Sequence, residues 1–262
     1  MKILFIGDIV GKLGRRGLAK ILPVWKKEHD LDLIIANVEN IAHGVGVTPA
    51  TLEEVKKAGV DFFTTGNHWA DKPDGLALFE DESAPIIRPA NWPGKVPGQG
   101  YKIIELGSKR VAIINLQGQV FLKQGCDSPF HALDKVLKDI PKSVKIIIID
   151  FQAEATSEKR ALGLYADGRI SAFLGTHTHV PTADAQILPK GSAYVTDAGM
   201  CGALDSVIGD SKEGIIASFL DQLRRKHDIP ESGEVQINAV LLDIDNSGKA
   251  RSIDRLDAFV DV

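Results

Sequence analysis

Five short polar clusters follow runs that are typical of buried strands, and their side chains are of the types that bind metal ions. Asp, Glu, Asn and His supply the oxygen and nitrogen ligands of metal sites. In an open α/β sheet, ligands bind outside the carboxyl ends of the strands, so parallel strands would bring all five clusters to one edge. The clusters are Gly7–Asp8, Asn37–Asn40, Gly66–His68, Asp150–Gln152 and Gly175–His179.

The pair His177 and His179 is the strongest single element of this pattern. Residues two apart on an extended segment point to the same side, so both imidazoles would reach one small volume. A lone Asp after a strand, such as Asp8, is by itself typical of a turn or a helix cap. The metal-site hypothesis therefore depends on several clusters converging rather than on any one of them.

The candidate ligands are too many for a single zinc ion, which takes about four. Two ions about 3.5–4 Å apart, bridged by a carboxylate, would use them all. Such a pair clamps two phosphate oxygens, holds a hydroxide for in-line attack and stabilises the departing oxygen, which is the chemistry of phosphoester hydrolysis. The candidates are Asp8, Glu39, Asn40, Asn67, His177 and His179.

The elements that must position these residues alternate between strand and helix, which indicates an α/β layered fold. Continuously apolar, β-branched runs predict buried parallel strands over Lys2–Gly7, Leu31–Ala36, Val60–Thr64, Lys145–Ile149 and Ile170–Leu174. Helices are predicted over Leu13–Lys27, over Pro49–Ala58 with Thr48 as N-cap, and over Pro73–Phe79 after Asp71 in the same role.

Later strands are expected to form a second sheet stacked on the first. A hairpin is predicted within Tyr101–Leu116, turning at Gly107–Ser108. The turn-rich stretch Pro89–Gly100 is interpreted as a surface loop inside one domain, so residues 1–262 are predicted to be a single domain. The other predicted strands are Ala183–Leu188, Ala193–Thr196, Val235–Asp243 and Ala250–Phe259.

The composition excludes several classes of protein. With 262 residues, 44 % hydrophobic and 25 % charged, the chain is neither disordered nor fibrous. A net charge of −4 gives no general attraction to nucleic acid or anionic lipid, so no stable nucleic-acid partner is expected. No apolar run approaches the 18 or so residues of a membrane helix. The two distant cysteines, Cys126 and Cys201, are no disulfide framework, which favours a cytoplasmic protein with reduced thiols.

The motifs Gly7–Asp8, Gly66–His68 and Gly175–His179 resemble, in the same order, those of the calcineurin-like metallophosphoesterase superfamily. Longer strings resemble its YmdB-like branch, which comprises bacterial cytoplasmic phosphodiesterases that act on 2′,3′-cyclic nucleotides. The resemblance spans nearly the whole chain. The strings are FIGDIVGKLGR, VENIAHGVG, TTGNHWADK, RPANWPGK, AIINLQGQVF, DFQAEATSEK, GTHTHVPTAD and PKGSAYVTDAGMCG.

The resemblance implies a four-layer α/β/β/α sandwich and a two-metal site. The metals implied are iron first, with manganese, zinc or magnesium as alternatives. His68 would be the general acid that protonates the leaving oxygen. The implied ligands are Asp8, Glu39, Asn40 and His179 for one ion, and Asn67, Gln152 and His177, with Glu39 bridging, for the other.

Two positions depart from the motifs. The superfamily usually has His two residues after the first Asp, where this chain has Val10, and the branch uses Asn40 instead. The branch usually has His where this chain has Gln152. An amide oxygen is a weaker ligand than imidazole for iron or zinc, so the second site would be retuned or weakened. The alternative is that Gln152 does not bind and water fills the gap.

Three further residues are interpreted from their local sequence. His43 is a candidate for contacting the substrate phosphate or the metal-bound water, with loop packing as the alternative. Glu154 and Glu158 flank Thr156 and Ser157 before a helix, a pattern that favours capping.

The function expected is a dinuclear metal-dependent phosphodiesterase acting on 2′,3′-cyclic nucleotides such as 2′,3′-cAMP. Its partners would be this small phosphodiester substrate and further copies of the chain in a homo-oligomer. The alternatives are a non-catalytic regulatory protein that binds metal or nucleotide, and a metal-dependent RNA nuclease. The acidic charge balance disfavours the nuclease.

Overall fold

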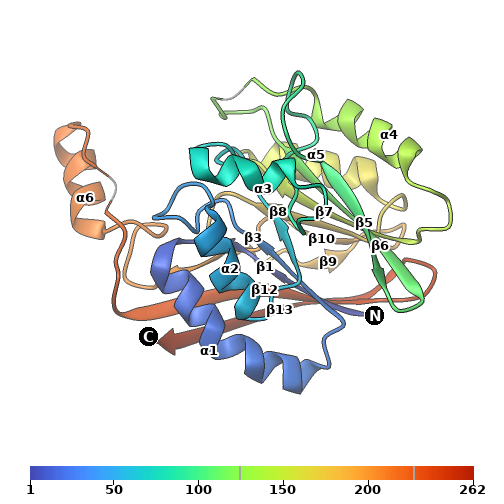
Figure 1. Cartoon of the computed structure of the whole chain (residues 1–262), viewed down its shortest axis with the longest axis horizontal. Coiled ribbons are helices and arrows are strands. Elements are labelled where there is room, and N and C mark those ends of the chain that lie inside the picture. The colour runs from blue at the N-terminus through green and yellow to red at the C-terminus, as the bar shows by residue number, and fades with distance from the viewer. Residues whose placement is uncertain (124, 227) are drawn as a thin grey trace.

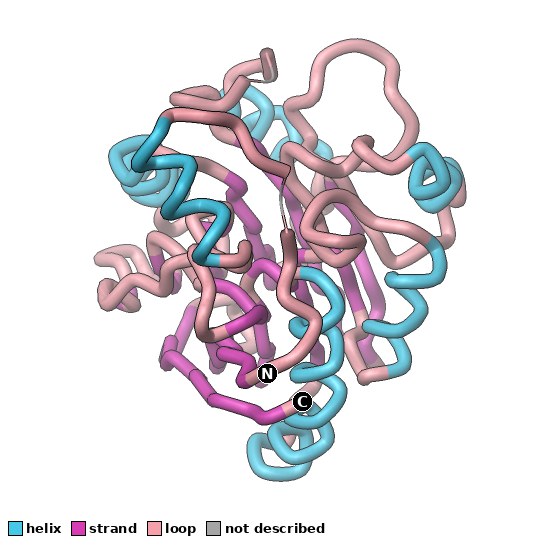
Figure 2. The backbone as a smooth tube through the Cα atoms, turned by 90° about the vertical axis from the view of Figure 1, so that its left-hand side faces the viewer, coloured by secondary structure: helices cyan, strands magenta, loops and turns pink. Residues whose placement is uncertain are grey.

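Two β-sheets pack face to face in the computed structural model, which describes residues 1–123, 125–226 and 228–262. Helices α1 (Gly11–His29) and α2 (Pro49–Lys57) cover the outer side of the first sheet, and α4 (Pro129–Asp139) and α5 (Thr156–Ala166) cover that of the second (Figures 1 and 2). The predicted four-layer α/β/β/α sandwich is therefore confirmed.

The two sheets are built as follows. The first has the order β2-β11-β12-β1-β3-β4, with β13 beside β12; its strands are β1 (Lys2–Ile6), β2 (Asp8–Ile9), β3 (Leu33–Asn37), β4 (Phe62–Thr64), β11 (Met200–Ala203), β12 (Glu234–Ile244) and β13 (Ala250–Asp261). The second has the order β5-β6-β7-β8-β10-β9; its strands are β5 (Tyr101–Leu106), β6 (Lys109–Gln117), β7 (Ile146–Gln152), β8 (Ala172–Thr176), β9 (Gln186–Ile187) and β10 (Ala193–Val195).

Burial on both faces explains why the predicted strands are apolar at every position. In β1, Ile3 and Phe5 lie in the core between the sheets, whereas Leu4 and Ile6 lie in the core beneath the helices of the first sheet. Strand β7 repeats the pattern, with alternate residues of Ile146–Ile149 contributing to the middle core and to the core under α4 and α5. Successive side chains of a strand point to opposite faces, so both must be apolar here.

The sheet arrangement corrects one expectation. The five predicted strands do not belong to one sheet, because β1, β3 and β4 lie in the first and β7 and β8 in the second. The later strands are also divided, since β12 inserts between β11 and β1 of the first sheet. The predicted hairpin is present as the antiparallel pair β5 and β6.

The predicted helix starts have mixed outcomes. Thr48 caps α2 with a reciprocal Thr48–Thr51 capping box, as expected of Ser or Thr at that place. The expected helix over Pro73–Phe79 is instead a 3₁₀ turn, η1 (Pro73–Gly75), followed by the short α3 (Leu76–Glu80). Its N-cap is Lys72 without a side-chain cap, so the capping role expected of Asp71 is wrong.

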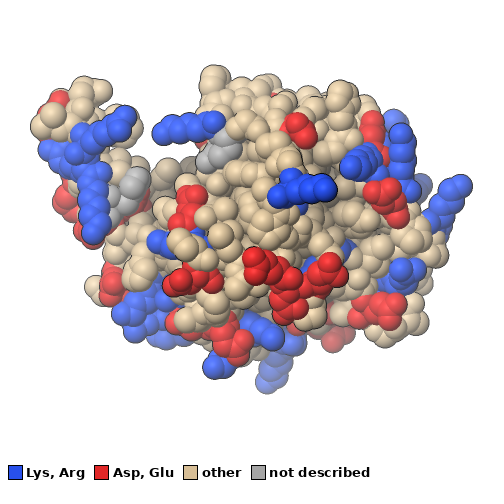
Figure 3. Space-filling view, turned by 45° about the horizontal axis from the view of Figure 1, so that its top comes forward, with Lys and Arg blue, Asp and Glu red and all other residues tan. Residues whose placement is uncertain are grey.

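Helix α6 (Lys212–Asp221) projects from the body of the molecule and has no buried residue (Figure 1). Basic side chains gather around α6 in Figure 3, whereas acidic and basic side chains are interspersed over the rest of the face shown. Within the described ranges, no helix combines the length and the apolar character needed to cross a bilayer.

Candidate active site

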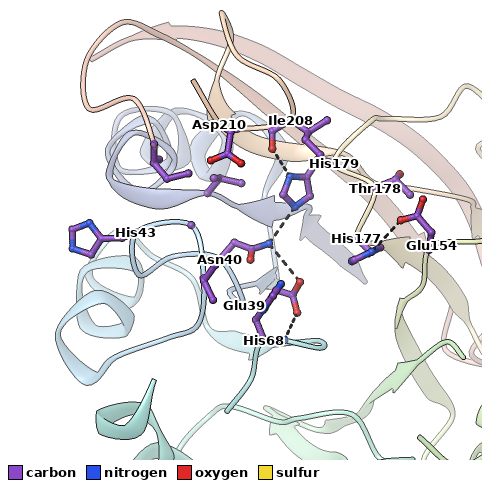
Figure 4. Close-up of a pocket in the computed structure, with 15 residues that line it drawn as sticks. Glu39, Asn40, His43, His68, Glu154, His177, Thr178, His179, Ile208 and Asp210 are labelled. Atoms are coloured by element: carbon purple, nitrogen blue, oxygen red, sulfur yellow. Dashed lines mark hydrogen bonds and ion pairs between the residues drawn. The ribbon is translucent and has the colours of Figure 1, made fainter. Parts of the chain in front are cut away.

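The polar clusters of both sheets meet around one cavity of about 320 Å³ (Figure 4). This volume lies at the small end of the range of about 300–1,000 Å³ that is usual for ligand pockets. A hydrogen bond joins the two sheets here, because the N–H of His177, which follows β8, donates to Oδ2 of Asp8 in β2 at 3.0 Å. One part of the wall is polar, with Glu39, Asn40, His43, His68, Glu154, His177, Thr178, His179 and Asp210; another is apolar, with Val10, Val45, Ile208 and Ile229.

Asp8 and Glu39 are buried carboxylates at the floor of the site. Burial raises the pKa of Asp8, although the nearby His179 lowers it. Burial, and then the charge of Asp8, raise the pKa of Glu39 well above its usual range. Two carboxylates that oppose each other's ionisation in a desolvated place are stabilised together by a cation.

His179 has the hydrogen bonding of a metal-ligating histidine. Its Nδ1 lies 2.7 Å from the carbonyl oxygen of Ile208. That oxygen can only accept, so Nδ1 carries the proton and Nε2 holds the lone pair. Nε2 lies 3.1 Å from Nδ2 of Asn40 and 3.8 Å from Oδ1 of Asp8. A backbone carbonyl that fixes the tautomer in this way is a common partner of histidine ligands.

Two oxygen atoms fit a cation because they are buried and otherwise unused. In the described part of the chain, Oδ1 of Asp8 and Oδ1 of Asn67 have no hydrogen-bond partner. Such atoms cost free energy unless an ion or a ligand binds them. The donor set depends on amides, since no three described His, Cys, Asp or Glu side chains are grouped closely enough to hold a metal by themselves.

His177 lies in the site, but the geometric reason for expecting it there is wrong. Strand β8 ends at Thr176, and His177 and His179 both have positive φ, 99° and 63°. They reach the cavity from an irregular loop rather than an extended segment. Nε2 of His177 contacts Glu154 at 3.1 Å and its Nδ1 lies 3.1 Å from Nε2 of Gln152. Burial, with a smaller effect of His179, lowers the pKa of His177 to about 4.

The amide oxygen of Gln152, the atom expected to bind the second ion, is turned away from the other candidate ligands. It accepts hydrogen bonds from Oγ1 of Thr176 at 2.6 Å and from Nδ2 of Asn37 at 3.1 Å. The nitrogen of the same amide donates to Glu39. As arranged, Gln152 offers the candidate ligands a donor and not an acceptor.

His68 and His43 occupy different parts of the cavity. His68 follows β4, and its Nδ1 lies 2.6 Å from Oδ2 of Asp71. His43 lines the cavity from an exposed loop position with φ of 58°, and Figure 4 shows its ring apart from the group formed by Glu39, Asn40 and His179. His43 is thus an exposed residue of the cavity wall, whereas His68 lies beside Glu39, to which its backbone N–H donates.

Several residues that support the site were missed by sequence reasoning. Asp71 orients His68, and its i, i+3 spacing from that histidine was the available signal. Glu158 does not cap α5 but accepts the backbone N–H groups of Gln119 and Val120, so the capping interpretation is wrong. Glu154 likewise contacts His177 and does not cap the helix.

A buried polar network lies beneath the candidate ligands. Asp150 accepts hydrogen bonds from Asn37 at 2.9 Å and from Thr64, and its Oδ1 lies 2.6 Å from the hydroxyl oxygen of Thr176. Burial raises its pKa to about 7 despite these bonds. Lys159 pairs with Asp197 at 2.6 Å, and Asp197 also accepts the N–H and the hydroxyl of Thr178, which fixes the histidine loop.

Gly66 is required for close packing and not for a sharp turn. A Cβ at this position would collide with the side chains of Glu39 and Gln152, which pass directly over it. Gly7 and Gly175 are similar, since a Cβ there would meet the carbonyl oxygens of Gly199 and Thr196. None of the three has a positive φ.

Comparison with known proteins identifies the family. A family model described as YmdB-like protein matches residues 4–256. The chain belongs to the YmdB-like family. It is 44 % identical over 257 residues to the 2′,3′-cyclic-nucleotide 2′-phosphodiesterase of Bacillus subtilis (strain 168), and the match covers 98 % of this chain and 96 % of that protein.

Solved structures agree with the YmdB-like assignment. The crystal structure of a novel phosphatase from Mycoplasma pneumoniae has a TM-score of 0.93 and 35 % identity, covering 100 % of this chain and 94 % of that one. A hypothetical protein from Thermus thermophilus has a TM-score of 0.92 and 38 % identity, with 99 % of both chains covered. The expectation that this chain is an enzyme of the phosphoesterase class is confirmed.

Proposed function

We propose that this chain is a metal-dependent phosphodiesterase that hydrolyses 2′,3′-cyclic nucleotides. The observation that carries the proposal is the meeting of Asp8, Glu39, Asn40 and His179 beside one cavity, with a buried oxygen of Asp8 left without a partner among the described residues. The Bacillus subtilis relative, whose name states this activity, supports the choice of substrate.

The residues fit a metal ion, with Asp8, Asn40 and His179 as the group that would hold it and Glu39 beside them. When bound, the ion supplies positive charge that withdraws electrons from the phosphoryl oxygens. Asp8 and Glu39 would fix the position of the ion, because their carboxylates are buried beside the cavity. His179 would keep its lone pair on Nε2 because Ile208 holds the proton on Nδ1.

His68 is proposed as the proton donor to the leaving oxygen. Asp71 holds Nδ1 of the ring, which leaves Nε2 as the nitrogen that gives the proton. The contact with Asp71 orients the ring for this proton transfer. The apolar side chains Val10 and Ile208 would receive the uncharged part of the nucleotide, and His43 would contact the substrate away from the metal ligands.

The test is hydrolysis by the purified full chain loaded with Fe²⁺ or Mn²⁺. We expect conversion of 2′,3′-cAMP to a nucleoside monophosphate, which chromatography detects. EDTA should abolish this turnover, and addition of either metal should restore it. Tight binding of 2′,3′-cAMP without hydrolysis would instead identify a regulatory binding protein. Faster cleavage of long RNA than of the cyclic nucleotide would identify a nuclease.

A further inference from the structure

The amide of Gln152 lies between two side chains that a second metal ion would need. Its Nε2 donates a hydrogen bond to Oε1 of Glu39 and lies 3.1 Å from Nδ1 of His177. An amide nitrogen can only donate, so Nδ1 of His177 is the acceptor. Nε2 of His177 then carries its proton and donates to Glu154 at 3.1 Å. One NH₂ group therefore satisfies both a carboxylate and an imidazole that would otherwise bind a cation.

The orientation of this amide is fixed from its other side. Oε1 of Gln152 accepts from Thr176 at 2.6 Å and from Nδ2 of Asn37 at 3.1 Å. Asn37 cannot turn over in response, because its Oδ1 accepts the backbone N–H of Glu39 at 3.1 Å. Reversing Gln152 would set NH₂ against NH₂ and its oxygen against a carboxylate. Like groups in contact in a buried place are costly, so Gln152 keeps its oxygen away from the candidate ligands.

The amide of Asn40 is held less firmly than that of Gln152. Its Nδ2 donates toward Nε2 of His179 at 3.1 Å, but its Oδ1 accepts no hydrogen bond from any described residue. Reversing this amide costs only the bonds of the nitrogen, which include a long one of 3.5 Å to Glu39. Asn40 is therefore free to present an oxygen to an ion that replaces its bond to His179.

We propose that this chain holds one metal ion, bound by Asp8, Asn40 and His179, and that the amide nitrogen of Gln152 takes the place of a second ion between Glu39 and His177. The inference rests on the proposed function only for the existence of the first ion. The difference between the two halves of the site comes from hydrogen bonds. His179 offers a free lone pair toward Asp8, whereas the lone pair of His177 is already used by Gln152.

The experiment counts ions on the full-length protein. Metal-free protein is loaded with Mn²⁺ and desalted, the metal per chain is measured by inductively coupled plasma mass spectrometry, and electron paramagnetic resonance reports whether ions are coupled. We expect one uncoupled Mn²⁺ per chain in the wild type. We expect two coupled ions in Gln152→His, because imidazole replaces the blocking NH₂ group with a ligand.

Two histidine variants locate the single ion. His179→Ala should lose it, whereas His177→Ala, altered two residues away in the same loop, should retain one ion per chain. Gln186→His is the matched control for an added imidazole, because Gln186 is exposed on β9. This control should bind as the wild type does.

Two coupled ions in the wild type would overturn the proposal, and this measurement does not depend on any variant folding. A folded Gln152→His protein that still binds one ion would also overturn it, because residue 152 would then not set the count. Loss of the ion from His177→Ala together with its retention in His179→Ala would do the same. One tightly held ion without turnover of 2′,3′-cAMP would refute the proposed function alone.

Discussion

Asp71 holds the ring of His68 by Nδ1 at 2.6 Å, while the main chain of the same histidine donates to Oε2 of Glu39 at 3.2 Å. The side chain is thus attached to an outer carboxylate and the backbone to a candidate metal ligand. The ring and the backbone of His68 are therefore held by different residues. Replacing the ring leaves the backbone hydrogen bond to Glu39 in place.

His68→Ala should lower turnover of 2′,3′-cAMP by about 10²–10⁴-fold, which is the usual contribution of a general acid. Metal content should not change, because the backbone donor to Glu39 remains. The loss should be much smaller for bis-p-nitrophenyl phosphate, since nitrophenolate leaves without a proton. Equal losses with both substrates would show that His68 is not the proton donor.

Asp71→Asn provides the matched test of orientation. The amide keeps the size of the side chain but removes its charge. We expect a smaller loss of 2′,3′-cAMP turnover than in His68→Ala, and again a much smaller loss with bis-p-nitrophenyl phosphate, because the ring is present but no longer held by a carboxylate. Unchanged turnover of both substrates would argue against a functional role for the Asp71 contact.

Asn67→Ala should lower metal-dependent turnover but leave in place the ion held by Asp8, Asn40 and His179. The free energy of unfolding should stay nearly unchanged, because Oδ1 of Asn67 has no hydrogen-bond partner to lose among the described residues. Asn91→Ala is the opposite case, because Asn91 bonds Gln117 twice and Asp127 once in a buried loop. It should cost about 2 kcal/mol or more, without changing metal content. Urea unfolding and metal analysis of both variants decide between these outcomes.

Lys159→Met should destabilise the protein by about 3–5 kcal/mol, because it leaves Asp197 as a buried charge without its partner. The double variant with Asp197→Asn should recover part of this loss, since the amide oxygen still accepts from Thr178 and no charge remains. Urea unfolding at pH 7 measures both. Equal losses in the single and double variants would mean that the ion pair is not the cause.

Both thiols should react slowly in the folded protein. Burial, helped by Asp127, raises the pKa of Cys126 to about 11, and burial also raises the pKa of Cys201. A shift of about two pKa units lowers the thiolate fraction about a hundredfold, and the thiolate is the reactive form. Mass spectrometry after iodoacetamide treatment at pH 8 should find both unmodified when native and both alkylated in urea. Rapid labelling of native Cys201 would contradict this.

The sequence was sufficient for strands such as β1 and β7, because burial on both faces leaves an unbroken apolar run. The short strands β2 and β11 were not predicted. It could not predict that β12 would insert beside β1, because pairing between residues more than 200 positions apart leaves no local pattern. The division of the clusters between two sheets was missed for the same reason.

The residue types of the site were predictable, but their orientations were not. Asp is a residue type that often caps helices, and only the structure shows that Asp71 contacts His68 instead. The segment with His177 and His179 is not extended, because both residues have positive φ. No residue type in the segment predicts this conformation. The direction of the Gln152 amide depends on Asn37 and Thr176, which lie on two other strands.

The pairing of β1 has a consequence for folding during synthesis. One edge of β1 pairs with β3, and the other pairs with β12, from Lys2 opposite Asp243 to Ile6 opposite Ala239. During synthesis, this second edge of β1 stays unpaired until residues 234–244 have left the ribosome. Long-range pairing of this kind folds slowly, and open strand edges aggregate. A nascent chain stopped before residue 234 should expose the middle of its first sheet and depend on chaperones to stay in solution.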